Sequence, residues 1–164
     1  MRYSLSKVIV SIVLVVSYFA MPQVGFGGGG CSDTVTYWTG HVLYVLSHAN
    51  VWHLAANLLC LWMIPCRLHL GSSYFVAVVC SFLPCFIDEA TVGFSGVLFA
   101  IVGMSWGRVR RFMDMLWRNK WFLVIPMFIP HVNALLHVYC LIAGYLVGCY
   151  WRGDTVPHWT KDWL

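Results

Sequence analysis

The chain has 164 residues, of which 60% are hydrophobic and only 10% are Asp, Glu, Lys or Arg, with a formal net charge of +4. A soluble domain carries roughly 25% charged residues, so this composition excludes an ordinary soluble fold and favours one compact integral membrane domain. No basic stretch is interleaved with aromatic residues, so we expect the lipid bilayer and no nucleic acid as a partner.

The apolar segments predict an all-α membrane protein, a compact six-helix transmembrane bundle over residues 1–152 with a short tail at 153–164. The six spans are expected near residues 5–21, 50–66, 73–87, 95–107, 120–130 and 134–151. If both termini are cytoplasmic, all ten Lys and Arg residues lie on the cytoplasmic side, as the positive-inside rule requires. The last two spans are short, and we expect two helices there because Pro126 and Pro130 interrupt a single one.

The first apolar segment has two interpretations. Arg2 and Lys7 precede an apolar run, which fits a secretory signal peptide. An even number of spans instead favours a retained first transmembrane helix. The following stretch, Pro22 to His41, holds five glycines in six residues and is expected to be a flexible outer loop. A disulfide between Cys31 and Cys85 on the outer side also stays open.

Three polar residues are expected at one depth in the membrane. Ser95, His53 and His137 lie 13, 14 and 15 residues before the next cytoplasmic arginine, which is roughly 20 to 22 Å along a helix. In a hydrocarbon core about 30 Å thick, all three are then about 10 Å below the outer surface. Asn57 lies one turn from His53 on the same face. His48 is expected near the outer surface, as a supporting residue of the site or as a water-facing interfacial residue. Intramembrane polar residues are functional candidates by default.

The helix that begins at Ser95 is too short to span, so the preceding segment must enter the membrane. Irregular backbone at that depth requires shielding by protein or a water-filled cavity, and a hydrolase needs that water. The free amide of Ser95 at the helix start can stabilise an oxyanion. Gly93 and Gly96 leave room for a substrate carbonyl.

A histidine on another helix completes the expected chemistry. His137 is the candidate general base and acid, and His53 and Asn57 are candidate donors to the oxyanion. No carboxylate is expected at this depth, so we predict a Ser–His dyad. Phe99, one turn below Ser95, is placed to stack on the imidazole.

Three motifs carry a resemblance to a known family. They are HANVWHLAAN (His48 to Asn57), GFSG (Gly93 to Gly96) and HVYCLIAG (His137 to Gly144). In order and spacing they resemble the rhomboid intramembrane serine proteases. The resemblance implies Ser95 as nucleophile, His137 as its base, and His53, Asn57 and the Ser95 amide around the oxyanion. It also implies membrane-anchored, often single-pass protein substrates, no metal or organic cofactor and, by analogy, a bacterial cytoplasmic membrane.

Four features depart from the family pattern. Cys140 stands where the family usually has glycine, which is expected to loosen packing around His137. Phe99 replaces the usual tyrosine, so that stacking remains without a hydroxyl. Trp38 is followed by Thr39 where the family has a Trp-Arg pair. The turn before His137 is unusually short, which bears on substrate access.

Other interpretations of these residues compete with proteolysis. Taken alone, Ser95 fits a small packing residue, and His137 fits a buried structural histidine. A catalytically inactive rhomboid-like protein that binds transmembrane segments is the main rival, although such proteins generally lack the serine or the histidine. A transporter is disfavoured because no charged residue lies in the core. A metal site at His48 and His53 is disfavoured because their five-residue spacing separates them around a helix.

Overall fold

The computed structural model describes residues 2–27, 34–64, 69–84, 90–109, 112–121, 124 and 132–151. Within them the regular elements are helices, and one isolated β-bridge joins Phe26 to Thr91. The helices are α1 (Arg2–Ala20), α2 (Thr34–Leu43), the 3-10 turn η1 (Tyr44–Leu46), α3 (Val51–Met63), α4 (Leu70–Ser81), α5 (Ser95–Val109), α6 (Phe112–Arg118) and α8 (Ala134–Tyr150). The prediction of an all-α fold is confirmed for this part of the chain.

Five of the expected spans overlap α1, α3, α4, α5 and α8. The sixth, at 120–130, lies mostly outside the described residues, as do the tail at 153–164 and both Cys31 and Cys85. No helix among the described residues is both long and apolar enough to cross a membrane. The number of membrane crossings therefore stays a prediction.

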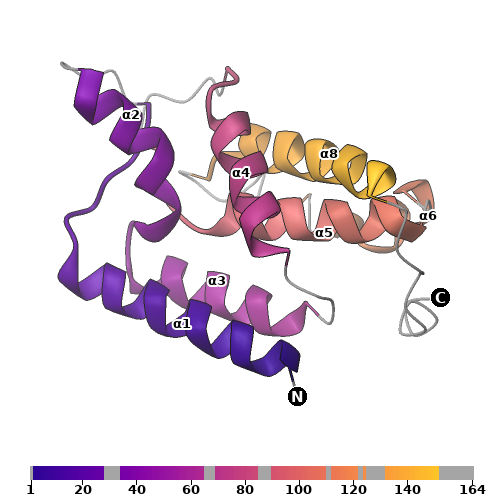
Figure 1. The fold of residues 1–164 in the computed structure, drawn as a ribbon, viewed down its shortest axis with the longest axis horizontal. Coiled ribbons are helices and arrows are strands. Elements are labelled where there is room, and N and C mark those ends of the chain that lie inside the picture. The colour runs from indigo at the N-terminus through magenta and orange to yellow at the C-terminus, as the bar shows by residue number, and fades with distance from the viewer. Residues whose placement is uncertain are drawn as a thin grey trace.

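Helices α5 and α8 run side by side and form the closest pair of the fold (Figure 1). Small residues allow this approach, because an added Cβ at Gly144 would collide with the backbone of Ala100 and one at Gly103 with the carbonyl of Leu141. Gly148 makes the same kind of contact with Met104. Glycine in a helix costs about 1 kcal/mol relative to alanine, and here it permits direct backbone packing. These three glycines are therefore packing positions between α5 and α8.

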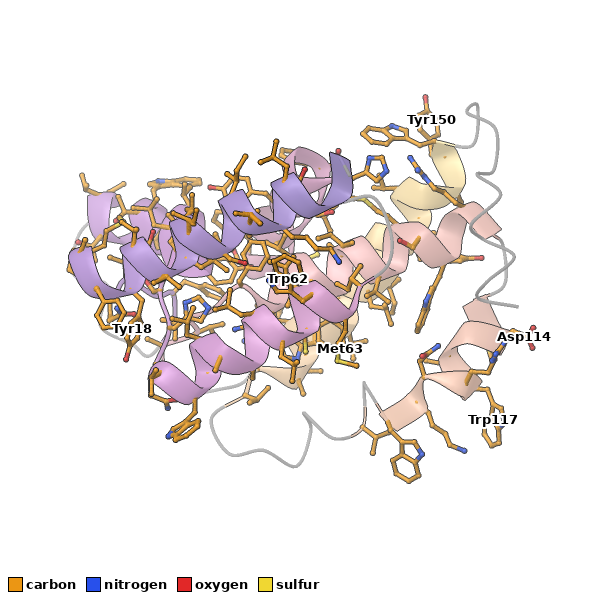
Figure 2. The ribbon with its side chains drawn as sticks, turned by 90° about the horizontal axis from the view of Figure 1, so that it is seen from below. Tyr18, Trp62, Met63, Asp114, Trp117 and Tyr150 are labelled. Carbon is orange, nitrogen blue, oxygen red and sulfur yellow. The ribbon has the colours of Figure 1, made fainter. Side chains whose placement is uncertain are left out.

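Helices α1 and α3 form a second pair, held by polar side chains (Figure 1). The Lys7 ammonium donates to the carbonyl oxygens of Trp62 and Ile64, at the C-terminal end of α3. Trp62 lies on the side of α3 toward α1, and its indole Nε1 donates to Ser11 Oγ at 3.2 Å (Figure 2). A cation at a helix C-terminus satisfies carbonyls that lack helical partners.

The segment from Pro22 to His41 is not a loop throughout, contrary to the prediction. Residues Thr34–Leu43 form α2, which packs near the end of α4. The His41 ring stacks between Phe26 and Phe82, with centroids 4.8 and 4.0 Å away, and its Nδ1 lies 2.7 Å from Ser81 Oγ. The aromatic residues Tyr37, His41 and Tyr44 recur at helical spacing. This spacing predicts a helix after the glycines, although the glycines themselves favour a loop.

Candidate active site

Ser95 and His137 come together at the interface of α5 and α8. Ser95 Oγ lies 2.8 Å from His137 Nε2, within hydrogen-bonding distance. Ser95 is the first residue of α5, and His137 lies in the first turn of α8. The pairing of the two helix starts therefore determines the separation of the two side chains.

The His137 ring is held from one side by an aromatic ring. Phe99 stacks on it with centroids 4.3 Å apart and planes inclined by 6°, so the stacking expected from the sequence is present. His137 is buried, and its Nδ1 has no hydrogen-bond partner among the described residues. Within that part of the chain, the serine and histidine thus form a pair without a third group.

The start of α5 leaves amides available for a ligand. Among the described residues, the amides of Val97 and Leu98 donate to the carbonyl oxygen of Phe94, at 3.0 and 3.2 Å. The N–H groups before them, at Ser95 and Gly96, point out of the first turn, as at any helix N-terminus. Donors so placed suit a developing negative charge.

Gly93, two residues before Ser95, lies next to the side chains of His53 and Asn57, the two expected oxyanion donors. Its φ of 119° lies in a region that side chains rarely adopt. A Cβ on Gly93 would lie 2.8 Å from His53 Nε2 and 3.5 Å from Asn57 Nδ2. The Nδ2 group of Asn57 is buried without a partner among the described residues. A buried donor of this kind calls for a partner, and a substrate oxygen would supply one.

The side chain of His48 is buried. The water-facing position that was expected from the sequence is therefore wrong. The side chain is 0% exposed and lies against His53, with ring centroids 5.3 Å apart. Its depth relative to the membrane stays a prediction. His48 precedes α3, which begins at Val51, and its backbone N–H donates to Gln23 Oε1 at 2.7 Å.

Tyr44 holds the loop before Ser95, and the sequence interpretation missed it. Its carbonyl oxygen accepts from the Gly93 amide at 2.9 Å, and its hydroxyl donates to the Ala77 carbonyl of α4 at 3.1 Å. A Cβ on Gly96 would lie only 3.0 Å from that hydroxyl. Tyr44 thus contacts both ends of the Gly93–Gly96 segment. Its helical spacing from Tyr37 and His41 was the available signal.

Asn133 links the starts of α5 and α8. Its Oδ1 accepts from the Leu136 amide at 3.0 Å and caps α8. Its Nδ2 donates to Thr91 Oγ1 at 2.9 Å, just before α5. Because His137 lies four residues after Asn133, this bond fixes the start of α8 relative to Ser95. An Asn before an apolar helical run was a readable N-cap signal.

The structure describes the positions of Cys140, Trp38 and Thr39, three residues that differ from the usual rhomboid pattern. Cys140 is fully buried, and a Cβ on Gly96 would lie 3.4 Å from its Sγ. An added methyl group at Gly96 would thus be in ordinary van der Waals contact with Cys140, and the looser packing expected around His137 stays a prediction. Trp38 is exposed, and Thr39 Oγ1 donates to the Val35 carbonyl within α2.

No group of three or more His, Cys, Asp or Glu that could hold a metal occurs among the described residues.

Comparison with known proteins places this geometry in a family. A family model for the rhomboid domain matches residues 35–153, which is most of the chain and includes both helix starts. A search of curated proteins gives no match. Rhomboid domains are membrane-embedded, and the family consists of intramembrane serine proteases and inactive relatives. The chain belongs to the rhomboid family.

Proposed function

We propose that this protein is an intramembrane serine endopeptidase that uses a Ser95–His137 dyad. The observation that carries the proposal is the 2.8 Å separation of Ser95 Oγ and His137 Nε2, with Phe99 stacked on the imidazole. A serine placed only for packing needs no base, and a structural histidine needs no hydroxyl at a helix start. Their pairing is the arrangement that activates a nucleophile.

Acylation begins when His137 Nε2 accepts the Ser95 hydroxyl proton, which requires the ring proton on Nδ1. Ser95 Oγ then attacks the scissile carbonyl carbon, and the carbonyl oxygen becomes an oxyanion. The Ser95 amide, His53 and Asn57 Nδ2 are the proposed donors to that oxygen. Removal of one such donor typically costs 100- to 1,000-fold in rate, about 2.7 to 4 kcal/mol.

The second half of the cycle uses the same groups in reverse. His137 gives its proton to the leaving amine and frees the C-terminal product. A water molecule then donates its proton to His137 and attacks the acyl-enzyme, and the proton returns to Ser95 Oγ as the N-terminal product leaves. Phe99 keeps the ring in plane through both transfers, in a role that a carboxylate fills in a triad.

The proposed substrates are single-pass or otherwise membrane-anchored proteins, cut in or beside a transmembrane segment. The outer surface of the bundle supports a lipid environment, since Phe19, Trp52 and Tyr150 are 77, 80 and 87% exposed. We further propose six membrane spans within residues 1–152, both termini in the cytoplasm, and a bacterial cytoplasmic membrane. The distribution of Lys and Arg along the chain supports the orientation.

Cleavage of a model single-pass substrate by the protein in liposomes tests the proposal. Ser95→Ala and His137→Ala should each abolish cleavage without loss of helical content. A fluorophosphonate probe should label Ser95 in the wild type and not in His137→Ala. Absence of labelling and cleavage in a folded wild-type protein would instead identify an inactive relative that binds transmembrane segments.

A further inference from the structure

Helix α6 follows α5 and carries an exposed apolar stripe. Met113, Trp117 and Trp121 recur every four residues, and their side chains are 72, 72 and 63% exposed. Trp117 points away from the other helices (Figure 2), whereas Leu116 packs against the core. The seven residues of α6 extend about 10 Å. This helix is too short to cross a bilayer but can lie along its surface.

The positive charge of the chain is concentrated around this helix. From residue 108 to residue 121 the sequence has five arginines and lysines and one acidic residue, Asp114, which gives a net charge of +4. The whole chain also has a formal net charge of +4, because its other five basic and five acidic residues cancel. The net attraction for an anionic partner therefore lies in this segment.

Lys120 places one of these charges among the exposed rings. Its ammonium nitrogen, Nζ, lies 3.8 Å from the ring centroid of Trp117 and 5.8 Å from that of Trp121. Both distances are within the range of a cation–π contact. Tryptophan rings collect at the depth of the lipid headgroups, so an ammonium group beside two indoles is at the level of the lipid phosphates.

We propose that α6 and residues 119–121 bind an anionic phospholipid at the membrane surface. Trp117 and Trp121 contact the acyl chains below the headgroup, and the Lys120 ammonium pairs with the phosphate. The rhomboid domain is membrane-embedded, so a bilayer is available to this helix. A neutral phospholipid offers the same acyl chains without net charge, and the positive charge of the segment therefore selects the anionic lipid.

The experiment maps lipid contacts of the whole protein in phosphatidylcholine liposomes. The liposomes contain a small fraction of lipid with a photoactivatable diazirine beside the headgroup, either phosphatidylglycerol or phosphatidylcholine. After illumination, lipid adducts are located by mass spectrometry. We expect adducts on residues 112–121 to be about tenfold or more enriched with phosphatidylglycerol, as a few basic residues at an anionic surface produce. About 0.5 M sodium chloride should reduce this enrichment by screening.

Substitutions separate the role of the charge from that of the rings. Lys120→Gln should lower the enrichment about fivefold, and Lys120→Arg should keep it. Lys161→Gln removes the same charge from the tail and should leave the enrichment at 112–121 as in the wild type. Trp117→Ala should lower adduct formation with both lipids.

Three results would overturn the proposal. They are equal adducts from the two lipids on residues 112–121, an enrichment that survives Lys120→Gln, and an equal loss in Lys161→Gln. The mapping requires no proteolysis and no particular orientation, because both leaflets of the liposome contain the probe. Its outcome is therefore independent of the proposed proteolytic function.

Discussion

The two helix pairs of this fold are held together by different means. Helices α5 and α8 meet through glycines and backbone atoms, whereas α1 and α3 meet through Lys7, Ser11 and Trp62. Backbone contact leaves almost no freedom of approach, while long side chains tolerate small shifts. The pair that carries the dyad is the rigid one. The α1 helix lies outside the matched rhomboid region at 35–153.

A side chain placed between α5 and α8 should have the largest effect on the fold. Gly144→Val inserts a branched side chain against the Ala100 backbone, and we expect a loss of about 3 kcal/mol or more in unfolding free energy. Thermal unfolding in detergent and fluorophosphonate labelling measure the effect. Gly71→Val is the control, because nothing lies within 4 Å of a Cβ at that position. Similar stability of the two variants would refute the backbone-contact model.

A change at Lys7 tests the polar pair. Lys7→Met keeps the stem but removes the ammonium from the α3 carbonyls, and the side chain is only 7% exposed. A hydrogen bond to a charged group contributes about 1.5 to 3 kcal/mol, so the unfolding temperature should fall. Labelling at Ser95 should be unchanged where the protein is folded, because the contact lies at the far end of α3 from His53. Equal stability would show that the ammonium has no net role.

A paired substitution tests how tightly the nucleophile segment is held. Gly96→Ala places a methyl group 3.0 Å from the Tyr44 hydroxyl, and we expect labelling to slow about tenfold, or about 1.4 kcal/mol. Tyr44→Phe in the same chain removes the hydroxyl and should recover part of that loss. The measurement is the labelling rate of the two single variants and the double variant. Purely additive effects would contradict contact between these groups.

The smallest expected effect concerns the ring beside His137. Phe99→Leu removes the stacked ring and should slow labelling about fivefold, because aromatic pairs contribute about 0.5 to 1.5 kcal/mol beyond area burial. Phe99→Tyr should label at nearly the wild-type rate, since it keeps the ring. A leucine variant as fast as the wild type would show that α5 and α8 alone orient the histidine.

The Ser95–His137 dyad could be predicted from the sequence because the motifs around both residues are local and lie on helices of regular period. A serine between glycines, and a histidine before small residues on a later apolar run, are readable at fixed spacing, and counting along straight helices brings them to one depth. The water-facing position expected for His48 is wrong, because its side chain is buried before the start of α3. Asn133 and Tyr44 had local signals, an N-cap position and a helical spacing, but their partners in other segments, Thr91 Oγ1 for Asn133 and the Gly93 amide for Tyr44, could not be read from them. Pairings between distant segments leave no period in a sequence.

The bridge between Phe26 and Thr91 limits which residues can stand beside it. It consists of backbone bonds, Phe26 N–H to Thr91 O at 3.2 Å and Thr91 N–H to Phe26 O at 2.7 Å. A Cβ on Gly25 would lie 2.7 Å from the Thr91 oxygen, and one on Gly40 would lie 2.6 Å from the Gly25 oxygen. Positions 25 and 40 should stay glycine, and their loss would mark lineages in which the serine loop has been rebuilt.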